Sequence, residues 1–296
     1  MREICLAGLG LPGDTAAMKT LLCLGYGYSA AALAARLVPL GWSVIGTTRH
    51  AGAAEDLRTQ GVEPLVLPAD LTPALARATH VLATAAPDNN GDPFLGASLA
   101  AIRATRPDWV GYLSTTAVYG DHQGGWVDEA TPPNPQSARA VLRILAEKQW
   151  IATGLPVHIF RLAGIYGPGR GPFEKVRDGS ARRIIKPGQV FSRIHVDDIA
   201  ATLMASMARP NPGAVYNVCD DDPAPPEDVL AYAAALLGLP EPPGVPYEAA
   251  EMSPMARSFY GESKRVSNKR IRGELGVRLA FPTYRGGLAG LLERGY

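Results

Sequence analysis

Cysteine is scarce in this sequence, which has only Cys5, Cys23 and Cys219 among its 296 residues. The three are scattered singly, with neither a Cys-x-x-Cys pair nor nearby histidines to complete a metal site. The sequence therefore predicts no metal centre. We interpret the cysteines as reduced thiols, which favours a cytoplasmic protein over a secreted one held together by disulfides.

An excess of charge of one sign is also lacking, because 29 basic residues offset 28 acidic ones to a net charge of +1. No cluster of lysine and arginine suggests contact with a phosphate backbone, so we expect no nucleic-acid partner. No apolar run approaches the roughly 20 residues of a membrane helix, and the N-terminus lacks the order of a signal peptide. We expect a soluble protein with no membrane association.

The sequence is rich in hydrophobic residues, at 47%, and in glycine and proline, at 32 and 26 residues. Neither glycine nor proline repeats with a period, which is typical of a compact protein with many loops. Residues 1–17 precede a second methionine, Met18, after which the sequence has the pattern of a buried strand. We expect these 17 residues to form an extension outside the fold.

Two glycine-rich segments compete as phosphate-binding turns. The motif in residues 8–13 leads directly into another strand and leaves no room for a crossover helix, so we reject it. The second begins at Gly25, after a predicted strand over Thr20–Leu24, and opens an alanine-rich helix predicted over Ser29–Leu40. A strand over Trp42–Thr47 then completes a βαβ unit, which is the context that a dinucleotide-binding turn requires.

Each small residue of this second motif has a separate physical role. Gly25 permits a tight turn, Gly27 lets the backbone approach a diphosphate, and Ala30 allows close packing of the helix on the strand. The N-terminus of the helix then faces the anion. The residues expected to surround the diphosphate are Gly25, Tyr26, Gly27, Tyr28, Ser29 and Ala30.

The end of the second strand favours NADP over NAD. Enzymes that prefer NAD carry a carboxylate there for the ribose 2′-hydroxyl, but in this chain no acid appears before Glu55. Arg49 can instead pair with a 2′-phosphate, and Thr48 can donate its hydroxyl to it. The alternative, which the sequence leaves open, is that Arg49 is an ordinary solvated side chain.

The alternation of strands and helices continues beyond this unit. Further strands are predicted over Val62–Leu67, Thr79–Ala85, Trp109–Ser114 and Pro156–Arg161. The pattern predicts an α/β fold, a Rossmann-type doubly wound parallel sheet with a smaller C-terminal substrate lobe. Because ligands of such sheets lie beyond the carboxyl ends of the strands, the turns after the strands should carry the function.

These turns resemble those of the extended or atypical branch of the short-chain dehydrogenase/reductase superfamily, the NAD-dependent epimerase/dehydratases. The resemblance extends from about Met18 to the C-terminus. The segments that carry it are the glycine turn, Asp70-Leu71, Ser114 to Gly120, Arg161 to Gly169, and His195 to Ala200. The resemblance implies that Asp70 and Leu71 lie at the adenine, that Ala85 and Ala86 line the cofactor, and that Thr115 is the catalytic Ser/Thr.

One feature of that family is missing. Its members carry a Tyr-x-x-x-Lys pair on the helix after the fifth strand, where one helical turn places both side chains on a common face. Glu147 resembles the acid that follows the family's lysine by four residues, which places Arg139 at the tyrosine position and Arg143 at the lysine position. No Tyr-x-x-x-Lys occurs between Thr115 and Trp150 that would restore the pair in another register.

A guanidinium stays protonated at any working pH and has no acceptor, so Arg139 is excluded as a general base. Arg139 and Arg143 remain candidates for stabilising an oxyanion or binding a substrate carboxylate or phosphate. Alternatively they form a solvated helix face or pair with Glu147. The other groups expected near the strand ends that can supply a proton are Tyr112, Tyr119, Tyr166, His122 and His195.

The pattern changes beyond Gly169. We predict a short helix around Phe173–Asp178, a hairpin around Pro187-Gly188, a helix over Ile199–Ala208 capped by Asp197-Asp198, and a strand over Ala214–Val218. The resemblance implies that the last two elements return to the nucleotide sheet. The expected division is therefore a dinucleotide-binding domain over residues 18–168, joined by residues 193–219, and a substrate lobe made mainly from residues 169–296.

Residues 253–272 mix aromatic, sulfur-containing and basic side chains that suit an anionic, partly apolar substrate. Arg257 and Lys264 are the candidates for substrate binding in this segment. The basic residues near its end have another explanation, a helix that Ser267 caps and that ends near Gly276 with its basic side chains in solvent.

Two functions remain open. One is an NADP-dependent oxidoreductase or epimerase/dehydratase-like enzyme that acts on a small metabolite, for which nucleotide-linked and carboxylated compounds are the candidates. The other is a non-catalytic NADP-binding redox sensor or scaffold, which the loss of the tyrosine/lysine pair suggests. Fold alone does not choose between them, because chemistry belongs to the site. Either protein would be a monomer or a homodimer, since relatives often dimerise around the helix that carries Arg139.

Overall fold

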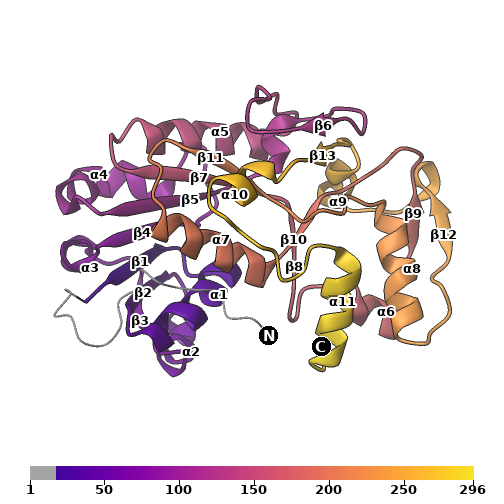
Figure 1. Ribbon diagram of the computed structural model, residues 1–296, viewed down its shortest axis with the longest axis horizontal. Coiled ribbons are helices and arrows are strands. Elements are labelled where there is room, and N and C mark those ends of the chain that lie inside the picture. The colour runs from indigo at the N-terminus through magenta and orange to yellow at the C-terminus, as the bar shows by residue number, and fades with distance from the viewer. Residues whose placement is uncertain (1–17) are drawn as a thin grey trace.

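A computed structural model describes residues 18–296, apart from the side chain of Ala97. The expected N-terminal extension, the rejected glycine motif and Cys5 all lie outside the described residues. Figure 1 shows the strands of the central sheet on the left and a smaller group of helices and short strands on the right.

The central sheet has seven strands, and every neighbouring pair in it is parallel. Its order is β11-β7-β5-β4-β1-β2-β3. The strands are β1 Thr20–Leu24, β2 Ser43–Thr48, β3 Glu63–Val66, β4 His80–Ala83, β5 Trp109–Thr115, β7 Val157–Leu162 and β11 Val215–Val218. The predicted Rossmann-type fold is confirmed, and each strand predicted for this sheet lies within two residues of its observed bounds.

Helices cover both faces of this sheet, as a parallel sheet requires. Leu33 of α1 and Leu203 of α7 lie in the apolar core on one face, whereas Ile102 of α4 and Trp150 of α5 lie in the core on the other. The helices around the sheet are α1 Tyr28–Leu37, α2 Ala54–Thr59, α3 Thr72–Arg77, α4 Pro93–Thr105, α5 Ala138–Ile151 and α7 Val196–Ala208. Short 3-10 turns occupy Val38–Leu40, Ala51–Ala53, Thr116–Tyr119 and Tyr247–Ala249.

The remaining strands form three small parallel pairs. These are β8 Gly164–Tyr166 with β10 Arg193–His195, β9 Arg183–Ile185 with β12 Gly244–Pro246, and β6 Trp126–Val127 with β13 Arg265–Val266. The remaining helices are α6 Phe173–Arg177, α8 Pro226–Leu236, α9 Pro254–Phe259, α10 Lys269–Gly273 and α11 Tyr284–Glu293. Helices α6, α8 and α11 enclose a third apolar core, which includes Phe173, Ala233 and Leu288.

Three local predictions beyond Gly169 were wrong. A turn does occur at Gly188, but no hairpin forms, because β9 and β10 on its two sides each pair with a strand distant in sequence. The cap of α7 is His195, whose Nδ1 accepts the Asp197 N–H, while the buried Asp198 carboxylate accepts two backbone N–H groups of residues 280–281. Helix α10 ends at Gly273, three residues earlier than predicted.

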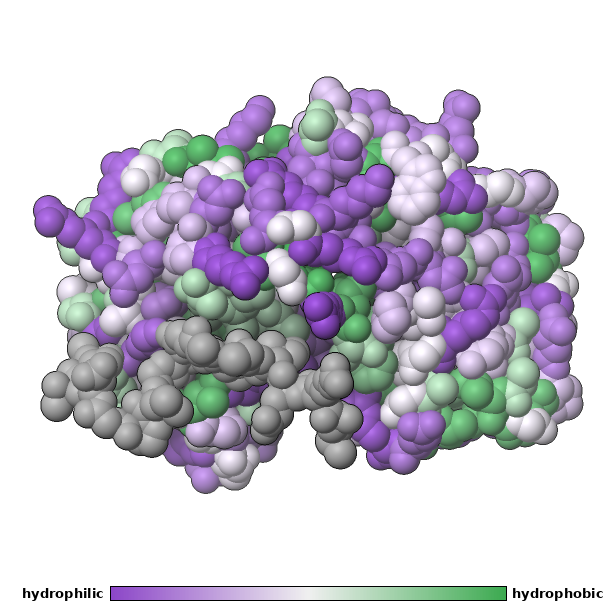
Figure 2. Space-filling model, in the orientation of Figure 1, coloured by the Kyte–Doolittle hydropathy of each residue, from purple (hydrophilic) through white to green (hydrophobic). Residues whose placement is uncertain are grey.

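Among residues 18–296, no helix is both long and apolar enough to cross a membrane. In the same part of the chain, no three histidine, cysteine, aspartate or glutamate side chains come together in a way that would hold a metal ion. Hydrophilic side chains cover much of the face shown in Figure 2, and hydrophobic ones gather toward its lower right, over α8 and its surroundings.

Candidate functional site

The glycine turn lies at the carboxyl end of β1, against the end of β4. Gly25 has φ +96°, and a Cβ there would lie 2.9 Å from the Ala85 nitrogen, so no other residue fits without a backbone shift. Its N–H donates to the Thr47 hydroxyl at 2.7 Å, and Thr84 donates its hydroxyl to the Gly25 carbonyl. The turn is therefore held on two sides by neighbouring strands.

Gly27 is the N-cap of α1, with ordinary extended backbone and no side-chain cap. The first backbone bond of the helix runs from Ala31 N–H to Gly27 O at 2.9 Å, so the earlier N–H groups have no partner within the helix. A Cβ on Gly27 would meet nothing within 4 Å, whereas Ala30 is fully buried against the core. Open space beside free amide groups is the cradle that a diphosphate needs.

The two tyrosines of this turn have different neighbours. Tyr26 packs over β2, where a Cβ on Gly46 would lie 2.8 Å from its ring, and its hydroxyl donates to the Gln60 side chain. Tyr28 donates its hydroxyl to the Pro168 carbonyl at 2.9 Å, 140 residues further along the chain. Ser29, the next residue, is buried.

At the end of β2, Thr48 accepts a hydrogen bond from the His50 N–H at 3.2 Å. Arg49 follows it and is exposed. No carboxylate among residues 18–296 forms an ion pair with Arg49. Its guanidinium is therefore accessible to an anion at the edge of the sheet.

The Asp70-Leu71 segment begins α3. Asp70 is exposed and accepts the Thr72 N–H at 2.9 Å, a bond that holds the pKa of its carboxyl below the usual value. The Leu71 side chain is buried in the apolar core. Sequence reasoning placed the two residues together as an adenine site, but the structure gives them different environments.

Arg143 reaches from α5 to the ends of β4 and β5. Its Nη1 donates to the Ala85 carbonyl at 3.2 Å, the Leu113 carbonyl at 3.0 Å and the Tyr112 hydroxyl at 3.1 Å. These three bonds, all those that the described residues make with Arg143, use the same nitrogen. The remaining N–H groups stay free to bind oxygen at this edge, beside the half-buried Ala85 and the exposed Ala86.

Arg139 lies near the start of α5, one turn before Arg143, and is exposed. Its guanidinium stacks on the Phe259 ring of α9 at 5.1 Å. This contact joins the helix after β5 to the segment that contains Arg257. Arg139 thus faces the C-terminal lobe rather than the interior of the sheet.

A buried polar network lies behind Thr115. Ser114 donates to Glu147 Oε1 at 2.5 Å, and Arg161 of β7 holds the same carboxylate through Nε at 3.1 Å and Nη2 at 2.8 Å. The alternative pairing of Arg139 or Arg143 with Glu147 is therefore wrong, because Glu147 points inward to Arg161. Thr115 accepts the Ala117 N–H at 3.2 Å, which leaves its own hydroxyl proton available.

Most of the other expected proton donors are buried or make hydrogen bonds that hold the fold together. Tyr119 donates to Asn217 at 2.7 Å, and burial raises the pKa of Tyr112 to about 12. Tyr166 is buried, and burial raises its pKa also. His195 caps α7, and burial lowers its pKa to about 4. The half-buried His122, with a ring nitrogen 3.2 Å from the Tyr119 carbonyl, is the least constrained of the five.

The two expected substrate-binding residues differ in their exposure to solvent. Arg257 is exposed, stacks on Tyr247 at 5.2 Å and donates to the Ala250 carbonyl. Lys264 is buried, and its Nζ contacts the Gly120 carbonyl at 2.8 Å and the Glu262 carboxylate at 2.6 Å. Lys264 thus ties the C-terminal lobe to the turn after β5, and its charge is already paired.

A Tyr-x-x-x-Lys spacing that sequence reasoning missed occurs at Tyr260 and Lys264. It does not reproduce the family's pair, because α9 ends at Phe259 and the two residues are not on a helix. The Tyr260 ring packs against Phe191 and Tyr247, whereas Lys264 bonds to Gly120. The spacing can be found in the sequence, but only the structure shows that the two side chains have different neighbours and do not form a pair.

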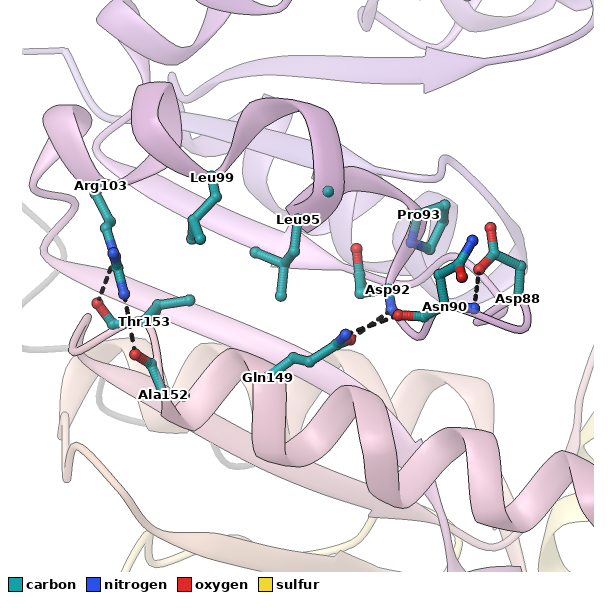
Figure 3. A pocket seen from close by; sticks show the side chains of 11 residues that line it. Asp88, Asn90, Asp92, Pro93, Leu95, Leu99, Arg103, Gln149, Ala152 and Thr153 are labelled. Carbon is teal, nitrogen blue, oxygen red and sulfur yellow. Dashed lines mark hydrogen bonds between the residues drawn. The ribbon is translucent and has the colours of Figure 1, made fainter.

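Two surface hollows lie outside this edge. A groove of about 360 Å³ runs between α4 and α5, where Figure 3 shows Arg103 bound to the carbonyls of Ala152 and Thr153. A second, of about 490 Å³, lies beside Trp126 and α10. The free amide groups, Arg49 and Arg143 all lie at the carboxyl edge of the sheet. Because these groups can bind anions, we take this edge as the candidate functional site.

A parallel sheet with a glycine turn after β1 and an open helix N-terminus defines a Rossmann-type dinucleotide-binding protein. Comparison with known sequences narrows this class. The sequence model of the NAD dependent epimerase/dehydratase family matches residues 97–219. Protein YeeZ of Escherichia coli K12 is 31% identical over 287 residues, covering 90% of this chain and 97% of that protein.

Solved structures share the fold. A functionally unknown conserved protein from Silicibacter pomeroyi is 58% identical with a TM-score of 0.89, covering 94% of this chain and 99% of that one. The dTDP-glucose 4,6-dehydratase of Bacillus anthracis, solved with NAD, has a TM-score of 0.76 at 16% identity, covering 94% and 96%. At that identity the likeness concerns the fold.

The chain therefore belongs to the NAD-dependent epimerase/dehydratase family, and the resemblance drawn from its sequence motifs is confirmed. The family binds a nicotinamide dinucleotide and acts on small molecules.

Proposed function

We propose that this protein binds NADP(H) along the carboxyl edge of the sheet and acts as an oxidoreductase or epimerase/dehydratase-like enzyme on a small metabolite. The observation that carries the proposal is the position of Arg143. Its guanidinium is anchored to the carbonyls of Ala85 and Leu113, at the ends of two central strands, with N–H groups still free. An arginine held in this way presents a fixed positive charge at the position where the sequence resemblance places the family's lysine.

The cofactor would lie with its diphosphate on the amide groups that begin α1, next to Gly27. Arg49 and Thr48 would hold the 2′-phosphate, which favours NADP, with NAD the less favoured cofactor. Asp70 would lie near the adenine, and Ala85 and Ala86 beside the other half of the cofactor. When bound, the nicotinamide supplies hydride exchange.

The residues of the chain would bind, orient and stabilise charge. The free N–H groups of Arg143 would hold hydroxyls of the cofactor ribose or a carbonyl oxygen of the substrate. Thr115 would donate its hydroxyl to the same oxygen, because that proton is not used within the fold. Arg139 lacks an acceptor and would bind an anionic group of the substrate instead.

The substrate would enter between this edge and the C-terminal lobe. We propose that residues 18–168 with 193–219 form the cofactor domain and that most of residues 169–296 form the substrate lobe. Arg139 and Arg257 both carry exposed charge and come from the two sides of this boundary. They favour a substrate with a carboxylate or phosphate, including a nucleotide-linked one.

Calorimetry with NADPH and NADH tests cofactor binding, and the loss of NADPH absorbance over a panel of carbonyl and sugar-nucleotide compounds tests turnover. We expect tighter binding of NADPH, and turnover that Arg143→Met reduces about a hundredfold or more. Absence of binding to both nucleotides would refute the proposal.

The rival function, a non-catalytic sensor or scaffold, is distinguished by two variants. Wild-type turnover that Arg139→Ala abolishes supports the enzyme. Turnover that appears only in the double variant Arg139→Tyr with Arg143→Lys supports the sensor. The rival rests on the loss of the tyrosine/lysine pair.

Location and assembly complete the proposal. Cys23 and Cys219 are free buried thiols, which supports a cytoplasmic location. We propose a monomer or a homodimer, with a homodimer formed through α5, whose Val141, Leu145 and Ile151 are exposed. Light scattering of the wild type and of Leu145→Glu distinguishes the two states, since the substitution would separate a dimer formed through this face.

A further inference from the structure

The hydrogen bond from Tyr28 to Pro168 joins two parts of the fold that meet at the proposed cofactor site. Tyr28 is the first residue of α1, which starts where β1 ends. Pro168 follows β8, the segment into which the chain passes after β7. In the sheet, β1 and β7 are separated by β4 and β5. The bond therefore links two separated parts of the edge along which the cofactor would lie.

The turn that receives this bond is rigid. Gly167 and Arg170 exchange two backbone hydrogen bonds, at 2.9 and 3.0 Å. A Cβ on Gly167 would lie 2.5 Å from the Tyr28 hydroxyl and 2.8 Å from a methyl group of Val196, so the turn packs closely against both α1 and α7. A closed turn of this kind holds the residue at its end, Arg170, in a defined place.

Arg170 is exposed, and its guanidinium stacks on the Tyr28 ring at 5.6 Å. No carboxylate of residues 18–296 forms an ion pair with it. Its charge also lowers the pKa of the Tyr28 hydroxyl, although burial has the larger effect and raises that pKa overall. The arginine is thus a cation without an ion pair among the described residues, and it stacks on the first residue of α1.

A cation beside the helix would add to the charge that the diphosphate meets there. A helix N-terminus contributes roughly half a positive charge, whereas the diphosphate of a dinucleotide carries about two negative charges. Arg49 lies at the end of β2 and Arg143 at the ends of β4 and β5, so these two arginines serve other parts of the cofactor. Arg170 stands beside the helix itself.

We propose that Arg170 is a ligand of the cofactor diphosphate and that Tyr28 positions it. This inference rests on the proposed binding of NADP(H). The tyrosine ring carries the guanidinium on its face, and the Tyr28 hydroxyl fixes the turn from which Arg170 projects. A residue from outside the βαβ unit thereby completes the anion site that the glycine turn begins.

The test compares two ligands, NADPH and 2′-AMP, the second of which has the 2′-phosphate but no diphosphate. Binding of NADPH is measured by calorimetry, and 2′-AMP by its displacement of NADPH. Arg170→Ala should weaken NADPH binding about tenfold and leave 2′-AMP binding within twofold of wild type. Arg49→Ala should weaken both ligands.

Tyr28→Phe keeps the ring but loses the bond to Pro168, and we expect about a threefold loss of NADPH affinity. Arg106→Ala, which removes the same charge before β5 at the opposite edge, should change neither ligand. Arg170 is exposed, so its variant should keep the wild-type melting temperature.

The two possible failures are distinct. If wild-type protein binds no NADPH, the proposed function fails. If it binds NADPH and Arg49→Ala weakens that binding, while Arg170→Ala matches wild type, only the role of Arg170 is overturned. Equal weakening of NADPH and 2′-AMP by Arg170→Ala would also overturn it, because the residue would then act on the adenosine half.

Discussion

Glu147 and Arg161 form a buried bidentate ion pair between α5 and β7, with Nη2–Oε2 at 2.8 Å and Nε–Oε1 at 3.1 Å. Both side chains are only 6% exposed. Ser114 adds a hydrogen bond to the same carboxylate, and the Arg161 guanidinium stacks on Tyr119 at 4.9 Å. The pair thus holds β7 against α5, which carries Arg139 and Arg143, and Ser114 joins β5 to the same carboxylate.

Breaking this pair should destabilise the protein strongly. Glu147→Gln leaves a buried guanidinium without its counter-charge, and removing one partner of such a pair costs about 3–5 kcal/mol. Urea unfolding measures the change in the free energy of unfolding. The control is Glu55→Gln, which removes the exposed ion pair with Arg58 and should cost under about 1 kcal/mol. Equal losses in the two variants would contradict the structural role of Glu147.

The two glycines of the α1 turn should separate stability from binding. Gly25→Ala places a Cβ 2.9 Å from the Ala85 nitrogen at a φ of +96°, so it should lower the free energy of unfolding by about 1–3 kcal/mol. Gly27→Ala meets open space at an ordinary φ and should leave folding unchanged.

The same Cβ on Gly27 would occupy the space through which the diphosphate approaches the helix. We therefore expect Gly27→Ala to weaken NADPH binding tenfold or more at an unchanged melting temperature. Thermal unfolding with and without NADPH measures both quantities. Full cofactor affinity in Gly27→Ala would place the diphosphate elsewhere.

Arg49 should set the choice between the two dinucleotides. Arg49→Ala removes a charge-assisted bond to the 2′-phosphate, so NADPH affinity should fall about tenfold while NADH affinity stays within twofold. The matched control is Arg58→Ala on the neighbouring helix α2, whose guanidinium pairs with Glu55. If Arg49→Ala leaves the ratio of the two affinities unchanged, Arg49 is a solvated side chain.

Stability should also depend on pH through Asp220. This carboxyl is 1% exposed, its Oδ2 has no partner among the described residues, and burial raises its pKa from 3.8 to about 8. Between these two values the folded protein holds a proton that the unfolded chain releases. The free energy of unfolding should therefore fall as pH rises from about 4 to about 8, by at most about 1.4 kcal/mol per unit.

The buried histidines change the free energy of unfolding with pH in the opposite direction, and their effect ends at a lower pH than that of Asp220. Burial lowers the pKa of His80 and His195 to about 4, so their contribution rises with pH and is complete near their unfolded value of 6.5. Comparison of wild type and variant between pH 6.5 and 8 isolates the carboxyl, because the histidine contribution is the same in both proteins. Asp220→Asn should flatten the slope in this window, whereas the exposed control Asp56→Asn should not. An unchanged slope in Asp220→Asn would assign it to another group.

Much of the central sheet was predictable because its signals are local. The strand Thr20–Leu24 was placed with its observed bounds, and the glycine turn after it was chosen over a false motif by its βαβ context. The C-terminal lobe was less predictable. Its strands have two or three residues each and pair in parallel with distant partners, so neither their periodicity nor their turns identify them.

The sequence by itself determined the parallel sheet, the glycine turn and the family, because these depend on alternating hydrophobicity and on small residues at fixed spacing. Only the tertiary structure decided that Glu147 pairs with Arg161, that Arg143 binds the ends of β4 and β5, and that Tyr28 bonds to Pro168. Such contacts join residues far apart in the chain. Packing in three dimensions selects their partners, so no regular spacing of residues in the sequence predicts these contacts.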